Sequence, residues 1–305
     1  MDSEALKTFL CVHRTGSVSA AARLLSRTQS AISRRLAVLE REVGLPLFER
    51  VGRRIVTSDA GRTLLPFAER VAAALDDAQA AAERVRGGTA GIVRVATVGT
   101  LADERLTLAL QRVAARFPDV DIRLRTATSA EVSELVRAGE ATLGLRYFTD
   151  RRDGLSAKLV TMEPLIVACA PTHRLAGRRV ATLDRLATER WLAFPIEDRD
   201  SELFARSVIA QFLARGIVDV DWVAIDSLTA QKRLVEAGFG VALLQASAIR
   251  EELERKRLAT IAVGDLDVAV PIVSVTRPGA GMGAAATALL SALQAAPGRK
   301  VKRPV

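Results

Sequence analysis

Hydrophobic positions in the first part of the chain recur at helical spacing and are interrupted by residues that end helices. Four apolar residues share one face of a helix expected over residues 2–14: Leu6, Phe9, Leu10 and Val12. Gly16 ends this helix, and Ser17 is a suitable N-cap for a second, short helix that reaches Leu25. The alanines at 20–22 leave little side-chain bulk, so another helix can pack closely there. The pattern therefore predicts two helices joined by a tight turn.

A third helix is predicted within residues 28–50, and its two faces differ in character. At about 100° per residue, an apolar stripe lies opposite a polar stripe. The apolar stripe consists of Ile32, Leu36, Leu39 and Val43, and the polar stripe consists of Ser30, Arg34, Ala37 and Arg41, flanked by Gln29 and Ser33. Gly44 then ends the helix as a left-handed C′ residue does. A short helix, a tight turn and such a helix form a helix-turn-helix.

Residues 45–58 predict a small β-hairpin with Gly52 at its turn, which would be the wing of a winged helix. Arg50, Arg53 and Arg54 lie in this hairpin and suit contacts to phosphates or to the minor groove. Gln, Ser and Arg side chains, as on the third helix, read base edges and bind phosphates in the major groove. A solvated surface helix carries the same residue types, so periodicity leaves both interpretations open.

The net charge of +9 is concentrated at the two ends of the chain. Residues 1–58 contain ten Lys or Arg and five Asp or Glu, and a basic tail at 299–305 adds four more positive charges. Residues 59–298 then carry no net charge. A basic head on a neutral body indicates a polyanionic partner for the head. The tail either assists that contact or is a solvated chain end.

A long helix is predicted over residues 59–88, with Ser58 as its N-cap and Pro66 as a site of local adjustment. Small and apolar residues recur along it at offsets of three, four and seven: Leu64, Ala68, Val71, Leu75, Ala78, Ala82 and Val85. Gly87 and Gly88 then mark a hinge to the rest of the chain. This stripe of small and apolar residues, the seam, favours a helix that pairs with a second copy of the chain as a dimerisation arm. The alternative is that the helix packs on its own domain.

From residue 92 onward, short apolar segments alternate with amphipathic helical segments. This alternation predicts an α/β body with a mainly parallel sheet and helices on both faces. A late strand and helix, at 268–277 and 282–295, are expected to return to the first lobe. The body at 89–298 would then have lobe I at 91–162 and 268–297, lobe II at 163–267, and a cleft between the two lobes.

Ligands of open α/β sheets sit beyond the carboxyl ends of strands, and this rule gives the candidate ligand-binding residues. These are Thr97, Gly99, Thr100, Thr128, Ser129, Arg146, Phe148, Phe194 and Asp226. Helix N–H groups, hydroxyls and Arg146 together would suit a small carboxylate. The alternatives are that Thr128 is a helix cap, with Glu131 as its capping-box partner, and that Arg146 belongs to a surface ion pair.

The sequence gives little support to catalysis, metal binding or membrane insertion. The two histidines, His13 and His173, fall in different domains, and no Cys/His set has metal-ligand spacing. There is no Walker loop and no Gly-x-Ser-x-Gly, and "GFG" at 238–240 lacks the third glycine of a dinucleotide fingerprint. Cys11 and Cys169 fit buried thiols in a reducing cytoplasm, and the apolar runs are too short to span a bilayer. We therefore expect a cytoplasmic protein that is not an enzyme and has no cofactor or metal.

Three stretches of the first 61 residues resemble the DNA-binding head of the LysR-type transcriptional regulators. They are LKTFLCVHRTGSVSAAARLL, TQSAISRRLAVLEREVGLPLFER and GRRIVTSDAG. Ser30 stands where the family often has proline, and VTS stands where Leu-Thr is usual. The resemblance implies six DNA contacts, namely Gln29, Ser30, Ser33 and Arg34 to bases and phosphates and Arg50 and Arg53 from the wing.

The body also resembles this family, through the stretches EPLIVACAPTHRLA and LVEAGFGVALL. The fold implied is a winged helix-turn-helix at 1–58, a linker and dimerisation helix at 59–88, and a two-lobed effector-binding domain akin to periplasmic binding proteins. The function implied is sequence-specific transcriptional regulation, controlled by a small-molecule effector between the lobes. The expected partners are double-stranded DNA with an interrupted inverted repeat, the effector, further copies of the chain in a dimer or tetramer, and RNA polymerase.

Two other classes of protein remain as alternatives. A solute-binding or transferase-like α/β protein with an incidental basic head would bind a ligand and show no sequence-specific DNA binding. An architectural protein would bind DNA of any sequence, with an affinity set by salt.

Overall fold

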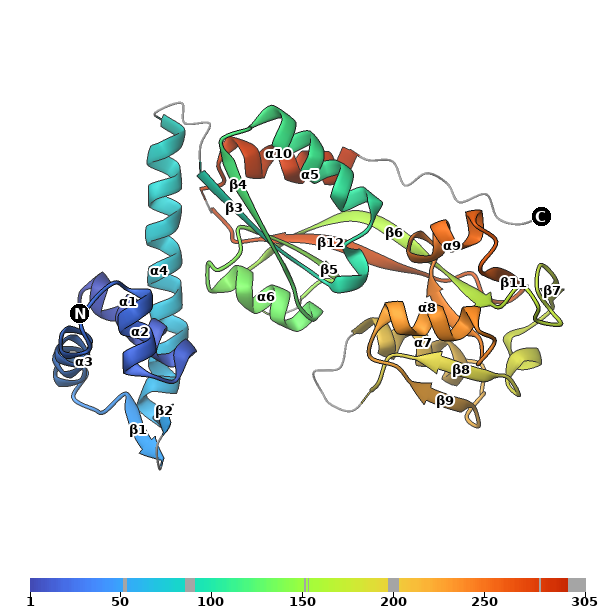
Figure 1. Cartoon of the computed structure of the whole chain (residues 1–305), viewed down its shortest axis with the longest axis horizontal. Helices are drawn as coiled ribbons and strands as arrows, with labels where there is room; N and C mark the ends of the chain where they lie inside the picture. Colours follow the sequence, from blue (N-terminus) through green and yellow to red (C-terminus); the bar gives the residue numbers. More distant parts are fainter. Residues whose placement is uncertain are drawn as a thin grey trace. The chain divides into compact units, whose positions relative to one another are not determined.

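The structure is a computed structural model that describes residues 1–51, 54–85, 91–150, 152, 154–196, 203–279 and 281–295. The chain divides into two compact units, the first built on Met1–Gly88 and the second on most of the remaining residues (Figure 1). We describe each unit by itself. The predicted hinge at Gly87 and Gly88 and the basic tail lie outside the described residues.

The first unit begins with three helices, each of which starts at a side-chain cap. They are α1 (Ser3–Thr15), α2 (Val18–Leu24) and α3 (Gln29–Val43). Their caps accept hydrogen bonds from backbone N–H groups, Asp2 from Ala5 at 2.6 Å, Ser17 from Ala20 at 3.3 Å and Thr28 from Ala31 at 3.2 Å. The left-handed backbone of Gly16 (φ 60°) ends α1, and that of Gly44 (φ 79°) ends α3, as predicted.

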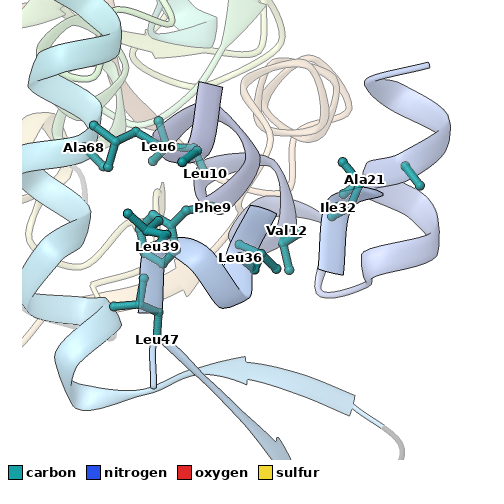
Figure 2. Packing of buried hydrophobic residues seen from close by; sticks show 12 residues of the cluster. Leu6, Phe9, Leu10, Val12, Ala21, Ile32, Leu36, Leu39, Leu47 and Ala68 are labelled. Carbon is teal, nitrogen blue, oxygen red and sulfur yellow. The ribbon is translucent and has the colours of Figure 1, made fainter. Parts of the chain in front are cut away.

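The apolar faces of these helices form one core, shown in Figure 2. Phe9 of α1 and Ile32 and Leu39 of α3 are fully buried in it. The ring of Phe9 lies 5.3 Å from the ring of Phe48, which brings the start of the wing into the same core. The helical spacing of the sequence therefore identified the core of this unit correctly.

The wing is the antiparallel pair β1 (Phe48–Val51) and β2 (Arg54–Thr57). Phe48 pairs with Thr57 and Val51 pairs with Arg54, so the register is that of a short hairpin. The Nδ1 atom of His13 lies 2.7 Å from the hydroxyl of Thr57 and links α1 to the wing. The predicted turn residue Gly52 lies outside the described residues.

Helix α4 (Asp59–Val85) follows the wing and contains Pro66. The Ser58 hydroxyl accepts from the backbone N–H of Gly61 at 3.0 Å and donates to the carbonyl of Pro46 at 2.6 Å, so Ser58 caps the helix as predicted. Part of the predicted seam packs against the core of the head, and part of it is exposed to solvent. Ala68 is buried in the core of the head and Leu64 packs against that core, whereas Val71 is exposed. The first part of the seam thus packs on its own unit.

The second unit opens with parallel strands connected by helices. Strands β3 (Gly91–Thr97), β4 (Val120–Thr126) and β5 (Leu143–Tyr147) pair in the order β4-β3-β5. Helices α5 (Glu104–Arg116) and α6 (Ser129–Arg137) connect them, on opposite faces of the sheet (Figure 1). Helix α10 (Ala284–Ala295) packs beside α5, so the end of the described chain returns to the first lobe, as predicted.

The prediction of a mainly parallel sheet is wrong, because the two longest strands form only antiparallel pairs. Strand β6 (Ser156–Cys169) and strand β12 (Ala269–Thr276) pair antiparallel with each other, and β12 also pairs antiparallel with β5. The second half of β6 pairs antiparallel with β10 (Ala242–Gln245) and β11 (Ala259–Val263), and β7 (Arg179–Val180) lies beside β11. One mixed sheet therefore extends through both lobes.

The second lobe adds a small parallel pair, β8 (Arg190–Ala193) and β9 (Asp221–Ala224). It also contains α7 (Leu203–Leu213), α8 (Leu228–Glu236), α9 (Arg250–Glu254) and the 3₁₀ turns Leu183–Leu186 and Ser247–Ile249, in addition to the 3₁₀ turn Gly99–Leu101 of the first lobe. The ring of Phe212 lies 4.7 Å from Trp191 and 4.9 Å from Trp222, and this aromatic cluster fills the space between α7 and the strands.

Candidate functional site

The polar face of α3 is open to solvent. Four of the predicted DNA contacts lie on it and are exposed: Gln29, Ser30, Ser33 and Arg34. On the opposite face, Ile32, Leu36 and Leu39 are buried in the head core. The buried stripe therefore fixes the rotation of α3, and the residues that face outward are those that can hydrogen-bond to a partner surface.

Neighbouring side chains hold the start of this face. The hydroxyl of Ser19 on α2 donates to Gln29 Oε1 at 3.2 Å, and the hydroxyls of Thr28 and Ser30 lie 3.1 Å apart. Arg34 forms no ion pair among the residues that the structure describes, in contrast to Arg35, which lies 3.7 Å from Glu4. The guanidinium of Arg34 is therefore an uncompensated positive charge at the centre of the face.

One of the two predicted wing contacts, Arg50, lies among the described residues. Arg50 on β1 is exposed. The other predicted wing contact, Arg53, lies outside the described residues. The basic character expected of the wing is thus visible at Arg50.

A cavity of about 410 Å³ opens between the two lobes of the second unit. Five of the predicted ligand-binding residues line it: Gly99, Thr100, Thr128, Phe194 and Asp226. The remaining lining residues were not predicted: Val98, Thr126, Ala127, Glu131, Phe204 and Leu228. Val98, Thr126 and Ala127 lie at or next to the ends of predicted strands. Phe204 and Leu228 come from the first turns of α7 and α8.

Four predicted residues lie outside this lining. Thr97 is fully buried and donates to the carbonyl of Val98, and Ser129 is buried and accepts from the backbone N–H of Tyr147 at 3.4 Å. Phe148 is half-buried and has a left-handed backbone (φ 57°) at the end of β5.

Arg146 is the fourth, and it is neither a surface residue nor part of the cavity wall. Its side chain is 4% exposed and lies 3.2 Å from the carboxylate of Asp150, itself 7% exposed. It also donates to the hydroxyl of Ser133. A buried guanidinium is stable only when it is paired and hydrogen-bonded, so the charge of Arg146 is matched by groups inside the first lobe. Asp150 stands four residues after Arg146, but this spacing brings side chains together on a helix, whereas Arg146 lies on a strand, so the sequence did not mark the pair.

The capping box at the start of α6 is present as predicted. The backbone N–H of Thr128 donates to Glu131 Oε2 at 2.8 Å, and the N–H of Glu131 donates to Thr128 Oγ1 at 3.3 Å. Both residues also line the cavity. The cap therefore fixes a carboxylate and a hydroxyl at the cavity wall.

A buried polar bridge links the cavity wall to the second lobe. The Tyr147 hydroxyl lies 2.8 Å from the hydroxyl of Thr100 and accepts from Gln245 Nε2 at 2.7 Å. Tyr147 ends β5 in the first lobe, and Gln245 ends β10 in the second. Both side chains are fully buried, so water does not compete for these hydrogen bonds.

An ionisable side chain is buried on β6, the strand that extends through both lobes. Glu163, at the middle of β6, is 4% exposed and accepts from the backbone N–H of Ser247 at 2.8 Å. Burial raises the pKa of the Glu163 carboxyl, and burial likewise raises the pKa of Asp103, which caps α5. At the surface, Arg250 of α9 lies 2.6 Å from Glu104 of α5.

Other chemistry finds no support in the described parts of the chain. No group of three His, Cys, Asp or Glu there is arranged to hold a metal ion. Cys11 and Cys169 are free thiols, and burial raises the pKa of Cys169 to about 11. Within the same residues, no helix has the length and apolar character needed to cross a membrane.

A winged helix-turn-helix joined to a two-lobed α/β body with an interlobe cavity defines a class of ligand-responsive DNA-binding proteins. Residues 3–62 match the family model described as "Bacterial regulatory helix-turn-helix protein, lysR family". Residues 86–297 match the one described as "LysR substrate binding domain". This chain belongs to the LysR family of transcriptional regulators.

Known members of the family are similar along most of the chain. The RuBisCO operon transcriptional regulator of Allochromatium vinosum is 28% identical over 261 residues, which cover 85% of this chain and 84% of that protein. The regulator CitR of Bacillus subtilis is 25% identical over 298 residues, 92% of each protein. The structure of full-length CbnR with its target DNA is 25% identical, with a TM-score of 0.65 over 96% of this chain and 99% of that one. These relatives are regulators, and DNA binding follows for this family member.

Proposed function

We propose that the exposed face of α3 reads a specific DNA sequence and that a small molecule in the interlobe cavity controls this binding. The observation that carries the proposal is the division of α3 into a buried apolar stripe and an exposed polar face with the unpaired Arg34. A helix that presents such a face beyond a tight turn fits the major groove.

The side chains on this face suit different contacts. A Gln amide can form a bidentate pair with adenine, and an Arg can do so with guanine or bind phosphates. Gln29 and Arg34 are therefore the proposed base-reading residues, and Ser30 and Ser33 are short enough to let the groove come close. Arg50 and Arg53 of the wing are proposed to contact the backbone and the minor groove.

We further propose that the protein acts as a dimer on an interrupted inverted repeat, and that dimers pair into tetramers. The support is the part of α4 that the head leaves uncovered, where Phe67 is 53% exposed and Val71 is 43% exposed, with exposed Ala74 and Ala78 one and two turns further on. A second copy of α4 would cover these residues. Two heads held in this way would bind half-sites about one or more helical turns apart.

The cavity with walls from both lobes supports the proposed control by a ligand. A molecule that binds one arrangement of the lobes more tightly shifts the population toward that arrangement by its difference in affinity. We propose that this shift changes the spacing of the two heads in a cytoplasmic protein, and so its contact with DNA and RNA polymerase.

The test is selection of bound fragments from sheared genomic DNA by the full chain, followed by sequencing. We expect enrichment of a few fragments that share an interrupted inverted repeat. The double variant Gln29→Ala/Arg34→Ala should lose about 2 to 6 kcal/mol of discrimination, because two base contacts are removed. Weak salt-dependent binding should remain, with a salt slope lower by about one charge.

Arg178→Ala is the matched control, because this exposed arginine lies in the second unit and forms no ion pair among the described residues. It removes the same charge and should keep the sequence preference. Full preference in the double variant would show that α3 is not the recognition helix. Uniform recovery of all fragments by the unaltered chain would favour an architectural protein.

A further inference from the structure

We infer that the interlobe cavity takes a ligand with a positively charged group, such as a primary ammonium, on an apolar and aromatic body. This inference rests on the proposed function of the cavity as the effector site and gives the chemical class of the effector. It differs from the small carboxylate that the strand-end positions suggested.

The charged residues of the cavity wall are all acidic. Among the described lining residues, the ionisable side chains are Glu131 from the first lobe and Asp226 from the second. No described lysine, arginine or histidine lines the cavity. A carboxylate ligand would therefore meet two like charges, whereas an ammonium would meet two opposite ones.

The position of Arg146 removes the cation that a carboxylate ligand would need. Its guanidinium is 3.2 Å from Asp150 and bonded to Ser133, so its charge is already matched inside the first lobe. Breaking a buried ion pair to bind a ligand leaves Asp150 less well compensated, which is strongly unfavourable.

The protein itself fills the anion position at the start of α6. The Glu131 carboxylate accepts the N–H of Thr128 at 2.8 Å, which is one of the groups that an incoming anion could use. At the start of α8, the hydroxyl of Ser227 likewise accepts from the N–H of Ala230, at 3.4 Å. At the starts of α6 and α8, a side chain of the protein therefore already accepts a backbone N–H.

The carboxylate of Asp226, in contrast, is not used by the part of the protein that the structure describes. It is exposed, and among the residues that the structure describes it has no hydrogen-bond or ion-pair partner. A carboxylate without a partner at the wall of an apolar cavity can accept from a ligand N–H without losing an internal contact.

The remaining walls fit the body of such a ligand. Phe194 and Phe204 line the cavity with their rings 6.3 Å apart and nearly perpendicular, and Val98 and Leu228 add apolar surface. Aromatic rings pack on each other, and their faces also attract cations. An ammonium on an aromatic body therefore matches both the rings and the carboxylates.

The same charges explain how a ligand would act. Glu131 and Asp226 belong to different lobes and line one cavity, so a ligand there meets both negative charges. A cation between them is attracted to both carboxylates, which favours a closer arrangement of the lobes. A neutral ligand of the same shape would lack this effect on the lobes.

The test uses the full chain and three probes that share one ring: benzylamine, benzyl alcohol and benzoate. Ligand-observed NMR titrations at neutral pH measure their affinities, which will be weak because each probe has few heavy atoms. We expect benzylamine to bind about fivefold more tightly than benzyl alcohol, since both carboxylates are solvent-exposed, and benzoate to bind most weakly. Added salt should reduce the advantage of benzylamine.

Three variants locate the effect. Asp226→Asn should remove most of the benzylamine advantage, and Asp219→Asn, which changes an exposed aspartate of the same lobe away from the cavity wall, should keep it. Gly99→Leu adds a large side chain at the cavity wall, where a Cβ has no atom within 4 Å. It should abolish binding of all three probes while the tryptophan fluorescence of the folded protein is unchanged.

The possible outcomes separate the two proposals. Equal affinities, or a preference for benzoate, that Gly99→Leu abolishes would overturn the cationic ligand and leave the cavity as the effector site. Binding that survives Gly99→Leu, or no binding of any probe, would overturn the inference about the cavity as a whole. The assignment of α3 to DNA is tested independently by the fragment selection.

Discussion

Removal of one hydroxyl, in Tyr147→Phe, tests the polar bridge between the lobes. In the folded protein this hydroxyl joins Thr100 at the cavity wall to Gln245 at the end of β10. Phenylalanine has the same ring and fills the same space, so the packing against Phe204, with ring centroids 5.2 Å apart, is retained. The variant therefore isolates the two hydrogen bonds.

The expected loss follows from the burial of the partners. A typical hydrogen bond contributes about 1 kcal/mol net, and a buried donor left unpaired costs about 1 to 3 kcal/mol. Gln245 is fully buried, and its Oε1 has no partner among the described residues, so its Nε2 would become a second unpaired group. Thr100 is half-buried and can turn to water. We expect Tyr147→Phe to lower the free energy of unfolding by about 2 to 3 kcal/mol.

Gln245→Leu and the double variant complete a double-mutant cycle with Tyr147→Phe. Gln245→Leu removes both polar atoms of the side chain, including the unsatisfied Oε1, so its cost should be about 1 kcal/mol or less. In the double variant the two apolar side chains face each other without an orphaned donor. The combined loss should therefore be smaller than the sum of the single losses by about 1 to 2 kcal/mol.

The assay is urea unfolding followed by tryptophan fluorescence. Both tryptophans, Trp191 and Trp222, lie in the second unit, and Trp191 is fully buried, so the signal reports the unfolding of this unit. Thr100→Val is the control, because it removes only the half-buried partner and should cost less than Tyr147→Phe. A loss below about 0.5 kcal/mol for Tyr147→Phe, or strictly additive losses in the cycle, would refute the bridge as a stabilising link.

Two further predictions use the same assay. Gly144→Ala places a Cβ 2.7 Å from methyl groups of both Val132 and Val275, so it should lower the free energy of unfolding by about 1 to 3 kcal/mol. Gly99→Ala is the control and should leave the free energy of unfolding unchanged. Equal effects of the two variants would contradict the close packing at Gly144. Burial raises the pKa of Glu163, so its favourable contribution is complete below its ordinary pKa and is lost as pH rises through the raised value. Glu163→Gln should therefore stabilise the protein near neutral pH and lose this advantage at about pH 4; a gain that is independent of pH would contradict it.

The head could be predicted closely from the sequence because its structure depends on local patterns. The stripe of Ile32, Leu36 and Leu39 needs only helical periodicity, and the stops at Gly16 and Gly44 need only the left-handed backbone that glycine tolerates. The exposed face of α3 is then the other side of the same pattern. No contact from elsewhere in the chain is needed to place it.

The body was predicted less completely because its sheet is assembled from distant segments. The first half of β6 is largely exposed, so it lacks the apolar run that marks the other strands, and it was missed. The same long strand makes the sheet mixed. Pairing of β12 with both β5 and β6 joins residues more than a hundred positions apart, which a local pattern does not show.

The residues of the cavity were likewise predicted only in part. Thr100, Thr128, Phe194 and Asp226 end predicted strands or begin helices, and their place was accessible from that rule. Phe204 reaches the cavity because of how α7 packs in the second lobe, and no signal in the sequence marks it. Arg146 occupies a strand end as well, yet it turns to Asp150, and the distinction between a free and a paired guanidinium depends on the fold.

The passage of β6 and β12 through both lobes has a mechanical consequence. Two strands that are hydrogen-bonded to each other along the crossing resist bending in the plane of the sheet, unlike two separate loops. Their ladder is irregular at one point, where Ile272 pairs with Thr161 and the next residue, Val273, pairs with Leu159. A bulge of this kind increases local twist. The lobes of this regulator should therefore move by a small torsion of a shared ribbon, whose softest point is the skipped residue Val160.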